Sequence, residues 1–262
     1  MSASFNGRTA LVTGAGRGIG RAVAVALSDA GANLVLLARS KDQLASTADE
    51  VSARGHSAVA VVADLSDATQ LKQIGRDVLE ASGGIDILVN NAATVAPLGA
   101  TTEIATEDFL STLILNVVAV TALTKALVPP MLERGWGRVV NVSSGLAVRP
   151  TSMPGGNTYV TSKAALEAHT ANLAAEVAGS GVTVNIYRPG TVDTTMQSWI
   201  REQDPQRIGE ELHRQFVAAH ERGSLISPER SAAALLQHLA GRETGQVWTV
   251  DSAPAAEAVR PK

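Results

Sequence analysis

The chain has 262 residues, of which 45% are hydrophobic and 18% charged, with a formal net charge of −3 and no cysteine. This length fits one large α/β domain over 1–262 better than two small ones, and the apolar share suffices for a well-buried core. The charge gives no reason to expect nucleic acid or an anionic membrane as partner. The lack of cysteine excludes a disulfide framework, a thiolate zinc site and a cysteine nucleophile, and the scattered histidines lead us to expect no metal.

The first residues, 1–14, lack a basic flank followed by a long apolar run, so we expect no signal peptide. We also expect no apolar segment long enough to span a bilayer. These features predict a soluble protein of the cytoplasm or of a cytosol-like organelle.

Short apolar runs alternate with longer segments of helical period. The runs, which read as strands buried on both faces of a parallel sheet, are 9–13, 33–38, 58–64, 86–90, 138–143, 182–187 and 246–250. Helices are predicted at 18–30, 40–55, 67–81, 106–134 and 157–179. This alternation predicts a single-domain, doubly wound α/β Rossmann fold, with about seven parallel strands and helices on both faces of the sheet.

Two segments lie outside the short connections of that fold. Residues 191–229 are long, partly helical and charged, and we expect this insertion to cover a substrate pocket. The segment near 252–262 is predicted to be a flexible tail, or a subunit contact if it is tied down.

The loop "TGAGRGIG" (13–20) follows the first strand and opens the first helix. Glycine permits the sharp turn and close ligand approach, and the helix N-terminus offers N–H donors to a pyrophosphate. A glycine-rich turn without a ligand is the alternative, but the order strand, loop, helix favours dinucleotide binding. The expected cofactor residues here are Gly14, Gly16, Arg17, Gly18, Ile19 and Gly20.

The end of the second strand bears on which dinucleotide is bound. Ala38 stands where NAD-binding folds usually carry an acid, and Arg39 follows it, with Arg17 as a second positive charge. This favours NADP(H), with NAD(H) possible, unless Arg39 is only a solvated loop residue. Asp64, followed by Leu65, closes the third strand and either accepts a hydrogen bond from adenine or caps the next helix.

Several further motifs follow in order along the chain. They are "NNAA" (90–93), Asn116, "NVSS" (141–144), "YVTSK" (159–163), "RPGTVDT" (188–194) and "TGQVWTVD" (244–251). With the glycine loop, they make nearly the whole chain resemble the short-chain dehydrogenase/reductase family. The resemblance implies NAD(P)(H), hydride transfer between the cofactor and a carbonyl or alcohol, and frequent dimers or tetramers.

The same resemblance implies the site residues. The catalytic group would be Asn116, Ser144, Tyr159 and Lys163. Lys163 would also contact the nicotinamide ribose, and Asn116 would organise a proton-relaying water. The remaining cofactor contacts would come from Asn91, Ala92, Tyr159, Lys163, Pro189, Gly190, Val192 and Thr194.

The chain departs from the family pattern at two places. Ala93 stands where the family usually has glycine; if φ is positive there the alanine is strained, and otherwise its methyl narrows the floor near the cofactor. After the last strand, "DSAPAA" replaces the usual glycine pair, which puts the standard C-terminal subunit contact in doubt.

Tyr159 and Lys163 are four residues apart and therefore share one face of a helix. We expect the lysine cation to lower the pKa of the phenol by about two to three pH units before desolvation is subtracted, and an oxidised nicotinamide to act in the same sense. Tyr159 would then give a proton to a carbonyl oxygen or take one from an alcohol. A serine hydroxyl at the end of the fifth strand would stabilise that oxygen.

Two adjacent serines compete for that role. Ser144 lies fifteen residues before Tyr159 and Ser143 sixteen, whereas the spacing in many relatives is thirteen. Ser144 fits better, with the extra residues enlarging a substrate-facing loop. Ser143 and Ser144 should point to opposite faces if the strand continues through them, and Ser152 is an outside candidate.

The sequence therefore predicts an NADP(H)-dependent oxidoreductase that acts on a small-molecule ketone or 3-oxoacyl compound and forms a homo-oligomer (tetramer or dimer). The alternatives are an NAD-dependent alcohol dehydrogenase, a non-catalytic dinucleotide sensor or scaffold, and a subunit docked through the altered tail. Arg188 would meet a polar substrate group or pair with an acid. The apolar pocket candidates, which favour a hydrophobic carbonyl compound, are Val95, Leu146, Met153, Met196 and Trp199.

Overall fold

The computed structural model describes residues 4–252, so most of the predicted tail near 252–262 lies outside the described residues. All the strands pair in parallel, in one seven-stranded sheet of order β3-β2-β1-β4-β5-β6-β7. The strands are β1 Thr9–Thr13, β2 Asn33–Ala38, β3 Ala58–Val62, β4 Ile87–Asn90, β5 Gly137–Val142, β6 Val182–Arg188 and β7 Val247–Thr249. The predicted doubly wound fold is thus confirmed.

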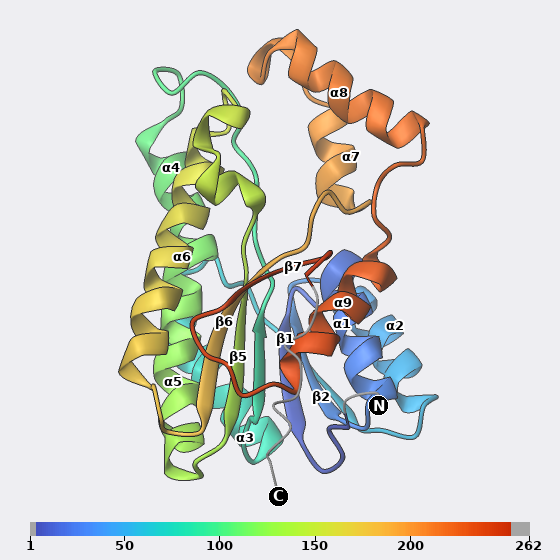
Figure 1. Ribbon diagram of the computed structural model, residues 1–262, viewed down its shortest axis with the longest axis vertical. Coiled ribbons are helices and arrows are strands. Elements are labelled where there is room, and N and C mark those ends of the chain that lie inside the picture. Colours follow the sequence, from blue (N-terminus) through green and yellow to red (C-terminus); the bar gives the residue numbers. More distant parts are fainter. Residues whose placement is uncertain (1–3, 253–262) are drawn as a thin grey trace, which may run out of the picture.

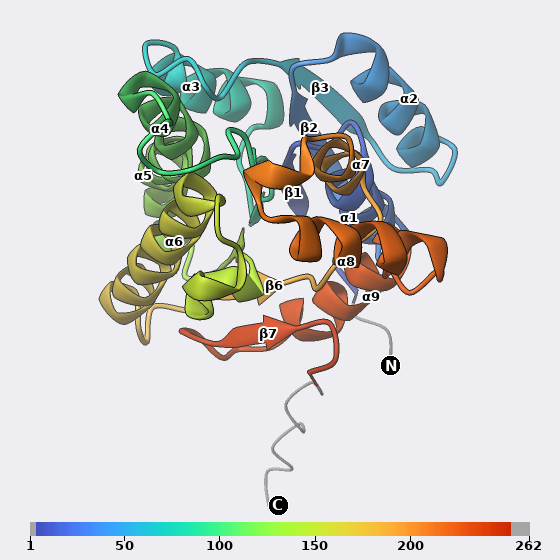
Figure 2. The same ribbon diagram turned by 90° about the horizontal axis from the view of Figure 1, so that it is seen from above.

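Helices cover both faces of this sheet (Figure 1). On one face lie α1 Gly18–Asp29, α2 Lys41–Ser52 and α9 Pro228–Leu239; on the other lie α3 Leu71–Ser82, α4 Thr106–Leu113, α5 Ala119–Glu133 and α6 Asn157–Glu176. Two further helices, α7 Thr195–Arg201 and α8 Glu210–Glu221, come from the insertion between β6 and β7. Seen from above, α7 and α8 lie over the carboxyl ends of the strands (Figure 2).

Alternate residues of each central strand enter different hydrophobic cores. In β1, Val12 packs with Val23 and Leu27 of α1, whereas Leu11 packs with the core that contains Ile74 of α3. Both strand residues are fully buried. Since each such side chain contributes about 1.5–3 kcal/mol on burial, a continuous apolar strand covered on both sides is the stable arrangement.

The edge strand β3 differs from this prediction. It ends at Val62, and three of its residues are exposed: Val59 at 37%, Val62 at 52%, and Ala60. The expectation that this run is buried on both faces is wrong, because β3 pairs only with β2 and its outer side is not fully covered.

The next helix, α3, begins at Leu71 rather than at 67. The Asp67 carboxylate accepts hydrogen bonds from the backbone and hydroxyl of Thr69 at 3.0 and 2.6 Å, and a third from Gln70. Such a local turn competes with helical geometry, so the helix starts after it.

The helix predicted at 106–134 is interrupted by a π-helical turn at Ile114–Val118, which separates α4 from α5. An 18-residue window of the stretch Thr106–Glu133 has a mean hydropathy of 1.8, so the stretch is by length and composition sufficient to cross a membrane. The expectation that no segment reaches that length is therefore wrong. Here α5 packs on α3 and the π turn packs on α6, as in a core helix.

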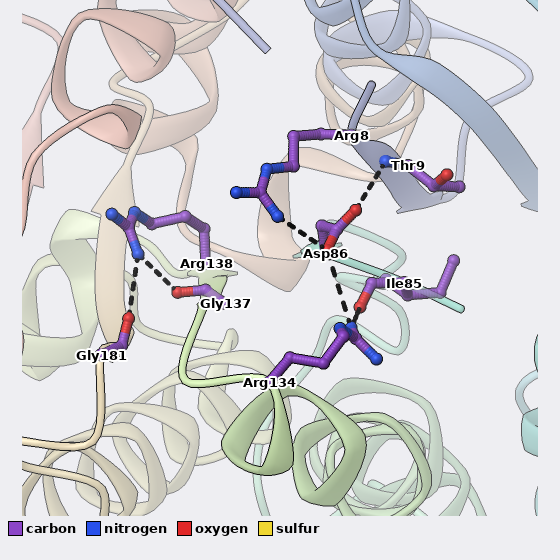
Figure 3. A network of polar contacts seen from close by, with 8 residues as sticks. All are labelled: Arg8, Thr9, Ile85, Asp86, Arg134, Gly137, Arg138 and Gly181. Carbon is purple, nitrogen blue, oxygen red and sulfur yellow. Dashed lines mark hydrogen bonds and ion pairs between the residues drawn. The ribbon is translucent and has the colours of Figure 1, made fainter. Parts of the chain in front are cut away.

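A network of charged side chains lies at the amino ends of the strands, at the end of the sheet opposite α7 and α8. The Asp86 carboxylate accepts from the backbone N–H of Thr9 at 3.1 Å and pairs with Arg8 at 3.3 Å and Arg134 at 3.7 Å (Figure 3). Arg134 also donates to the Ile85 carbonyl at 2.6 Å. These bonds hold the amino ends of β1 and β4 together, while the carboxyl ends of the strands face the cavity described next.

Candidate active site

One cavity of about 1650 Å³ lies at the carboxyl ends of the strands. The strand order reverses between β1 and β4, and ligands of doubly wound sheets lie at such a switch point. The glycine loop, the ends of β2, β4, β5 and β6, and the helices α7 and α8 all contribute to its lining. The structure thus brings most of the predicted site residues, which come from distant parts of the chain, to a single cavity.

The glycine loop has the conformation that a phosphate-binding turn requires. Gly14 and Gly18 have φ values of +66° and +55°, which favour glycine. Helix α1 begins at Gly18, and no side chain at its N-cap accepts a hydrogen bond from the N–H groups of the first turn. This loop, which lines the cavity with Arg17 and Ile19, fits a pyrophosphate.

Gly20, unlike Gly14, Gly16 and Gly18, does not line the cavity. A Cβ on Gly20 would stand 2.2 Å from the Gly14 carbonyl oxygen and 2.6 Å from Nδ2 of Asn91. Gly20 is therefore required for the close contact between α1 and the loop, and its predicted contact with the cofactor stays a prediction.

The segment after β4 is held to the end of β1. The Thr13 hydroxyl accepts from the backbone N–H groups of Asn91 and Ala92 at 2.9 and 3.0 Å, and the Asn91 side chain donates to the Thr13 carbonyl. Ala93, like Asn91 and Ala92, lines the cavity. Its φ is not positive, so the alanine is unstrained and its methyl only narrows the cavity.

Arg17, Arg39, Asp64 and Leu65 line the end of the cavity next to β2. Nη1 of Arg39 lies 3.8 Å from Oδ2 of Asp64, and both side chains are largely exposed. Asp64 does not cap α3; it accepts from the backbone and hydroxyl of Ser66 at 2.9 and 2.7 Å. Burial raises the pKa of Asp64, but these hydrogen bonds and Arg39 outweigh it and the pKa is lowered.

Asn116 lies in the π turn, is only 1% exposed and does not line the cavity. Its side chain bonds both backbone groups of Thr94, accepting from the N–H and donating to the carbonyl at 2.9 Å each. It also donates to the Ser162 hydroxyl of α6 at 2.9 Å. Asn116 thereby joins the segment after β4 to α6, with every buried polar atom of its amide satisfied.

Both serines after β5 line the cavity, but their side chains bond different partners. The Ser144 side chain accepts from the Leu146 N–H at 3.2 Å and lines the cavity beside Tyr159. Ser143 is 3% exposed and donates to Oε1 of Glu167 at 2.7 Å. Ser152 also lines the cavity, from the 3-10 turn Pro150–Ser152.

Tyr159 and Lys163 are buried, 9% and 3% exposed, on one face of α6 that borders the cavity. Nζ of Lys163 donates to the Val142 carbonyl at 2.7 Å and lies 5.8 Å from the centroid of the Tyr159 ring. Burial lowers the pKa of Lys163 to about 8, against an opposing effect of Glu167.

The expectation that Lys163 lowers the pKa of Tyr159 is wrong for this arrangement. Burial raises the pKa of the phenol, and only the Ser144 hydroxyl acts in the opposite sense. The physical reason is that Lys163 is bonded to a backbone carbonyl and is itself desolvated, while the phenol loses its water.

The segment "RPGTVDT" returns from β6 toward the glycine loop. Gly190 has a φ of +77°, and Val192 pairs with Ile226 in a parallel bridge. The Thr194 methyl lies 3.3 Å from the place of a Cβ on Gly18. Pro189, Gly190, Val192 and Thr194 all line the cavity, as predicted from the resemblance.

A hydrophobic cluster forms the wall of the cavity beyond Tyr159. The five predicted pocket residues, Val95, Leu146, Met153, Met196 and Trp199, belong to it. The sequence reading missed Leu212 and Phe216 of α8, which also line the cavity. Their spacing of four on an amphipathic helix was the available signal, but it did not reveal which surface α8 covers.

Glu167 was also missed, although it lies one helical turn after Lys163. Its carboxylate binds the Arg188 guanidinium through two hydrogen bonds of 2.8 and 2.6 Å. Arg188 therefore pairs with an acid, the second of the two roles considered for it. The spacing of four from Lys163 placed Glu167 on the same helix face, but its partner lies on β6.

In this doubly wound fold, one cavity is bordered by the glycine loop, a buried Tyr–Lys pair and a serine. This combination is that of an NAD(P)-dependent oxidoreductase. The family model for short chain dehydrogenase matches residues 8–205. The chain is 40% identical over 212 residues to oxidoreductase UcpA of Salmonella typhimurium, covering 79% of this chain and 80% of that protein. The chain belongs to the short-chain dehydrogenase family.

Solved structures agree with this assignment. L-sorbose reductase from Gluconobacter frateurii, complexed with NADPH and L-sorbose, superposes with a TM-score of 0.84 at 28% identity, over 96% of this chain and 97% of that one. A 3-oxoacyl (acyl-carrier-protein) reductase from Agrobacterium tumefaciens with NADP bound gives 0.81 at 31% identity, over 94% and 93%.

The lowered pKa of Lys163 predicts a pH-dependent stability. Between about 8 and 10.5 the unfolded chain holds the lysine proton and the folded chain does not, so stability rises with pH. The free energy of unfolding of the wild type, minus that of Lys163→Met, should rise by up to about 3 kcal/mol across this window. Urea titrations at a series of pH values measure it.

Lys125→Met is the matched control, because Lys125 is exposed on α5. Its difference from the wild type should stay flat over the same window. A flat difference for Lys163→Met would contradict the lowered pKa. Tyr159 is present in all three proteins, so its own titration cancels to first order.

Proposed function

We propose that this protein is an NADP(H)-dependent reductase of ketones or 3-oxoacyl compounds, with Tyr159 as the general acid and base. The observation that carries the proposal is that Tyr159, Lys163 and Ser144 border the same cavity as the uncapped glycine loop. A sensor or scaffold would need only the glycine loop. Hydride transfer also needs a proton donor at the reacting oxygen, and the position of Tyr159 at this cavity supports it as that donor.

The residues present fit a nicotinamide dinucleotide. The glycines leave the space and the N–H donors for a pyrophosphate, and Lys163 lies close enough to the cavity to hold a ribose hydroxyl. The segment Pro189–Thr194 would hold the nicotinamide end, and Asn91 and Ala92 would line the path between. When bound, the cofactor supplies or accepts the hydride.

The chain's own residues would manage the proton and the charge. The Ser144 hydroxyl donates to the carbonyl oxygen of the substrate and stabilises the negative charge that develops there. Tyr159, whose raised pKa keeps it protonated at neutral pH, gives its proton to the same oxygen. Asn116 holds the segment around Thr94 against α6, so its amide positions that segment, while its part in a proton relay stays a prediction from the resemblance.

The substrate side of the cavity supports a largely apolar carbonyl compound. The walls are Leu146, Met153, Met196, Trp199 and Phe216, and α7 and α8 supply three of them. This supports the insertion 191–229 as a cover for the substrate. The similar 3-oxoacyl reductase and L-sorbose reductase are reductases by name, which supports a carbonyl compound as the substrate.

The preference for NADP(H) rests on charge next to β2. Arg39 follows Ala38, and no acid stands at the strand end to accept a ribose hydroxyl or repel a phosphate. Arg17 adds a second guanidinium at the same cavity. Asp64 competes for Arg39, but its distance of 3.8 Å leaves the guanidinium free to turn to a phosphate.

We also propose a homo-oligomer, dimer or tetramer, in the cytoplasm. Large apolar side chains are exposed along the helix of α4 and α5: Leu110, Val118 and Leu132. Surfaces of this kind support an interface between subunits. Light scattering of the purified protein should give a mass of at least twice 27.0 kDa, and a monomer would contradict the proposal.

Tyr159→Phe tests the proposed mechanism. Loss of the phenol proton should lower kcat by about 10²- to 10⁴-fold on every ketone or 3-oxoacyl ester that the wild type reduces. The dissociation constant for NADPH, measured by fluorescence, should change little. Equal turnover by both proteins would refute the role of Tyr159.

Tyr187→Phe is the matched control for that experiment. It makes the same chemical change at a buried tyrosine that donates to the Ser231 carbonyl at 2.7 Å and does not line the cavity. Stability should fall by about 1 kcal/mol while kcat is retained.

Arg39→Ala tests the cofactor preference. The ratio of the NADH to the NADPH dissociation constant should fall by about 10- to 100-fold, since a charge-assisted hydrogen bond to the 2′-phosphate is lost. Lys41→Ala removes an equal charge two residues away that does not line the cavity, and should change the ratio little. Tighter binding of NADH by the wild type would refute the preference.

A further inference from the structure

Glu167 joins three parts of the site, although it does not itself line the cavity. Its carboxylate accepts from Ser143 at the end of β5 at 2.7 Å and from Arg188 at the end of β6 at 2.8 and 2.6 Å. It stands on α6 one turn after Lys163. Each partner is next to a proposed site residue: Ser143 precedes Ser144, and Arg188 precedes Pro189.

This arrangement is buried, which makes its charge balance matter. The side chains of Arg188 and Glu167 are only 18% and 13% exposed. In such surroundings a bidentate pair is stable as a unit, whereas either partner alone leaves an unpaired buried charge. The pair is close to a third charge, since Glu167 acts on Lys163 through the same low-dielectric region.

The groups around Lys163 leave few other sources of charge. On α6 itself its neighbours are Tyr159 and Glu167, and Arg188 of β6 is paired with Glu167. The neutral Ser143 at the end of β5 bonds Glu167, and the neutral Asn116 of the π turn bonds Ser162, the residue before Lys163. From the 3-10 turns that follow β5, Arg149 is exposed and lies back over Gly145.

The geometry points to Glu167 as a positioning residue of the reaction: it fastens the ends of β5 and β6 to α6, and with Arg188 it sets the electrostatic surroundings of Lys163. The inference rests on the proposed function for its meaning in catalysis. Glutamine partly separates position from charge: it keeps the shape of glutamate and one oxygen that can accept from Ser143 and Nε of Arg188, but it loses the charge and the bond from Nη2 of Arg188.

Opposite charge changes should move Lys163 in opposite directions. Glu167→Gln leaves Arg188 unopposed and should lower the pKa of Lys163, from about 8, by about one pH unit. Arg188→Gln leaves Glu167 unopposed and should raise it by a similar amount. A structural defect alone would not give shifts of opposite sign.

Titration of ¹³Cε-labelled lysine by NMR in the cofactor-free protein measures these pKa values directly, with Lys163→Met to identify the signal. The double variant Glu167→Gln with Arg188→Gln has no unpaired charge and should return close to the wild type. If Arg188→Gln alone does not fold, the comparison of Glu167→Gln with the double variant measures the effect of Arg188 instead. Ser143→Ala removes a neutral partner and should leave the titration within a few tenths of a pH unit.

Turnover tests the positional part. Glu167→Gln should keep kcat within about threefold of the wild type at its own optimal pH, whereas Glu167→Leu should lose at least about tenfold at every pH, because Ser144 and Pro189 are then less firmly held. Equal kcat values for Gln and Leu would overturn this part.

Shifts of the same sign, or none, in the lysine titration would overturn the electrostatic part. The titration needs no substrate and no turnover, so it stands even if Tyr159→Phe refutes the proposed function.

Discussion

The close contact between the glycine loop and the segment after β4 determines the geometry of the site. A Cβ on Gly20 would meet the Gly14 carbonyl oxygen at 2.2 Å, so α1 can approach the loop only with glycine at this position. That approach directs the N-terminus of α1 into the cavity. Thr13 then holds Asn91 and Ala92 beside the loop, so these contacts together build the floor of the cavity.

Buried polar side chains extend this arrangement to the far side of the cavity. Asn116 joins the segment at Thr94 to α6, and Glu167 joins α6 to the ends of β5 and β6. Each must find partners because it is removed from water. The partners that satisfy them are the backbone and side chains next to the proposed site residues, so stability and the positioning of Ser144, Tyr159 and Lys163 depend on the same bonds.

Local patterns identified most of the fold. Continuous apolar runs correctly predicted the central strands. The same pattern wrongly predicted burial of β3 on both faces, because only the strand order of the whole sheet makes β3 an edge strand. The start of α3 was misplaced because Asp67 bonds Thr69 locally. The π turn within 106–134 carries no distinctive pattern, since its residues are as apolar as those of the helices beside it.

The sequence by itself determined the doubly wound fold, the family and the order of the site motifs, because each depends on residues close together in the chain. Only the tertiary structure decided that Gly20 packs against the Gly14 carbonyl, that Ser143 bonds Glu167 while Ser144 bonds the Leu146 N–H, and that burial raises the pKa of Tyr159. Those outcomes depend on side chains from separate elements and on the exclusion of water, neither of which local spacing contains.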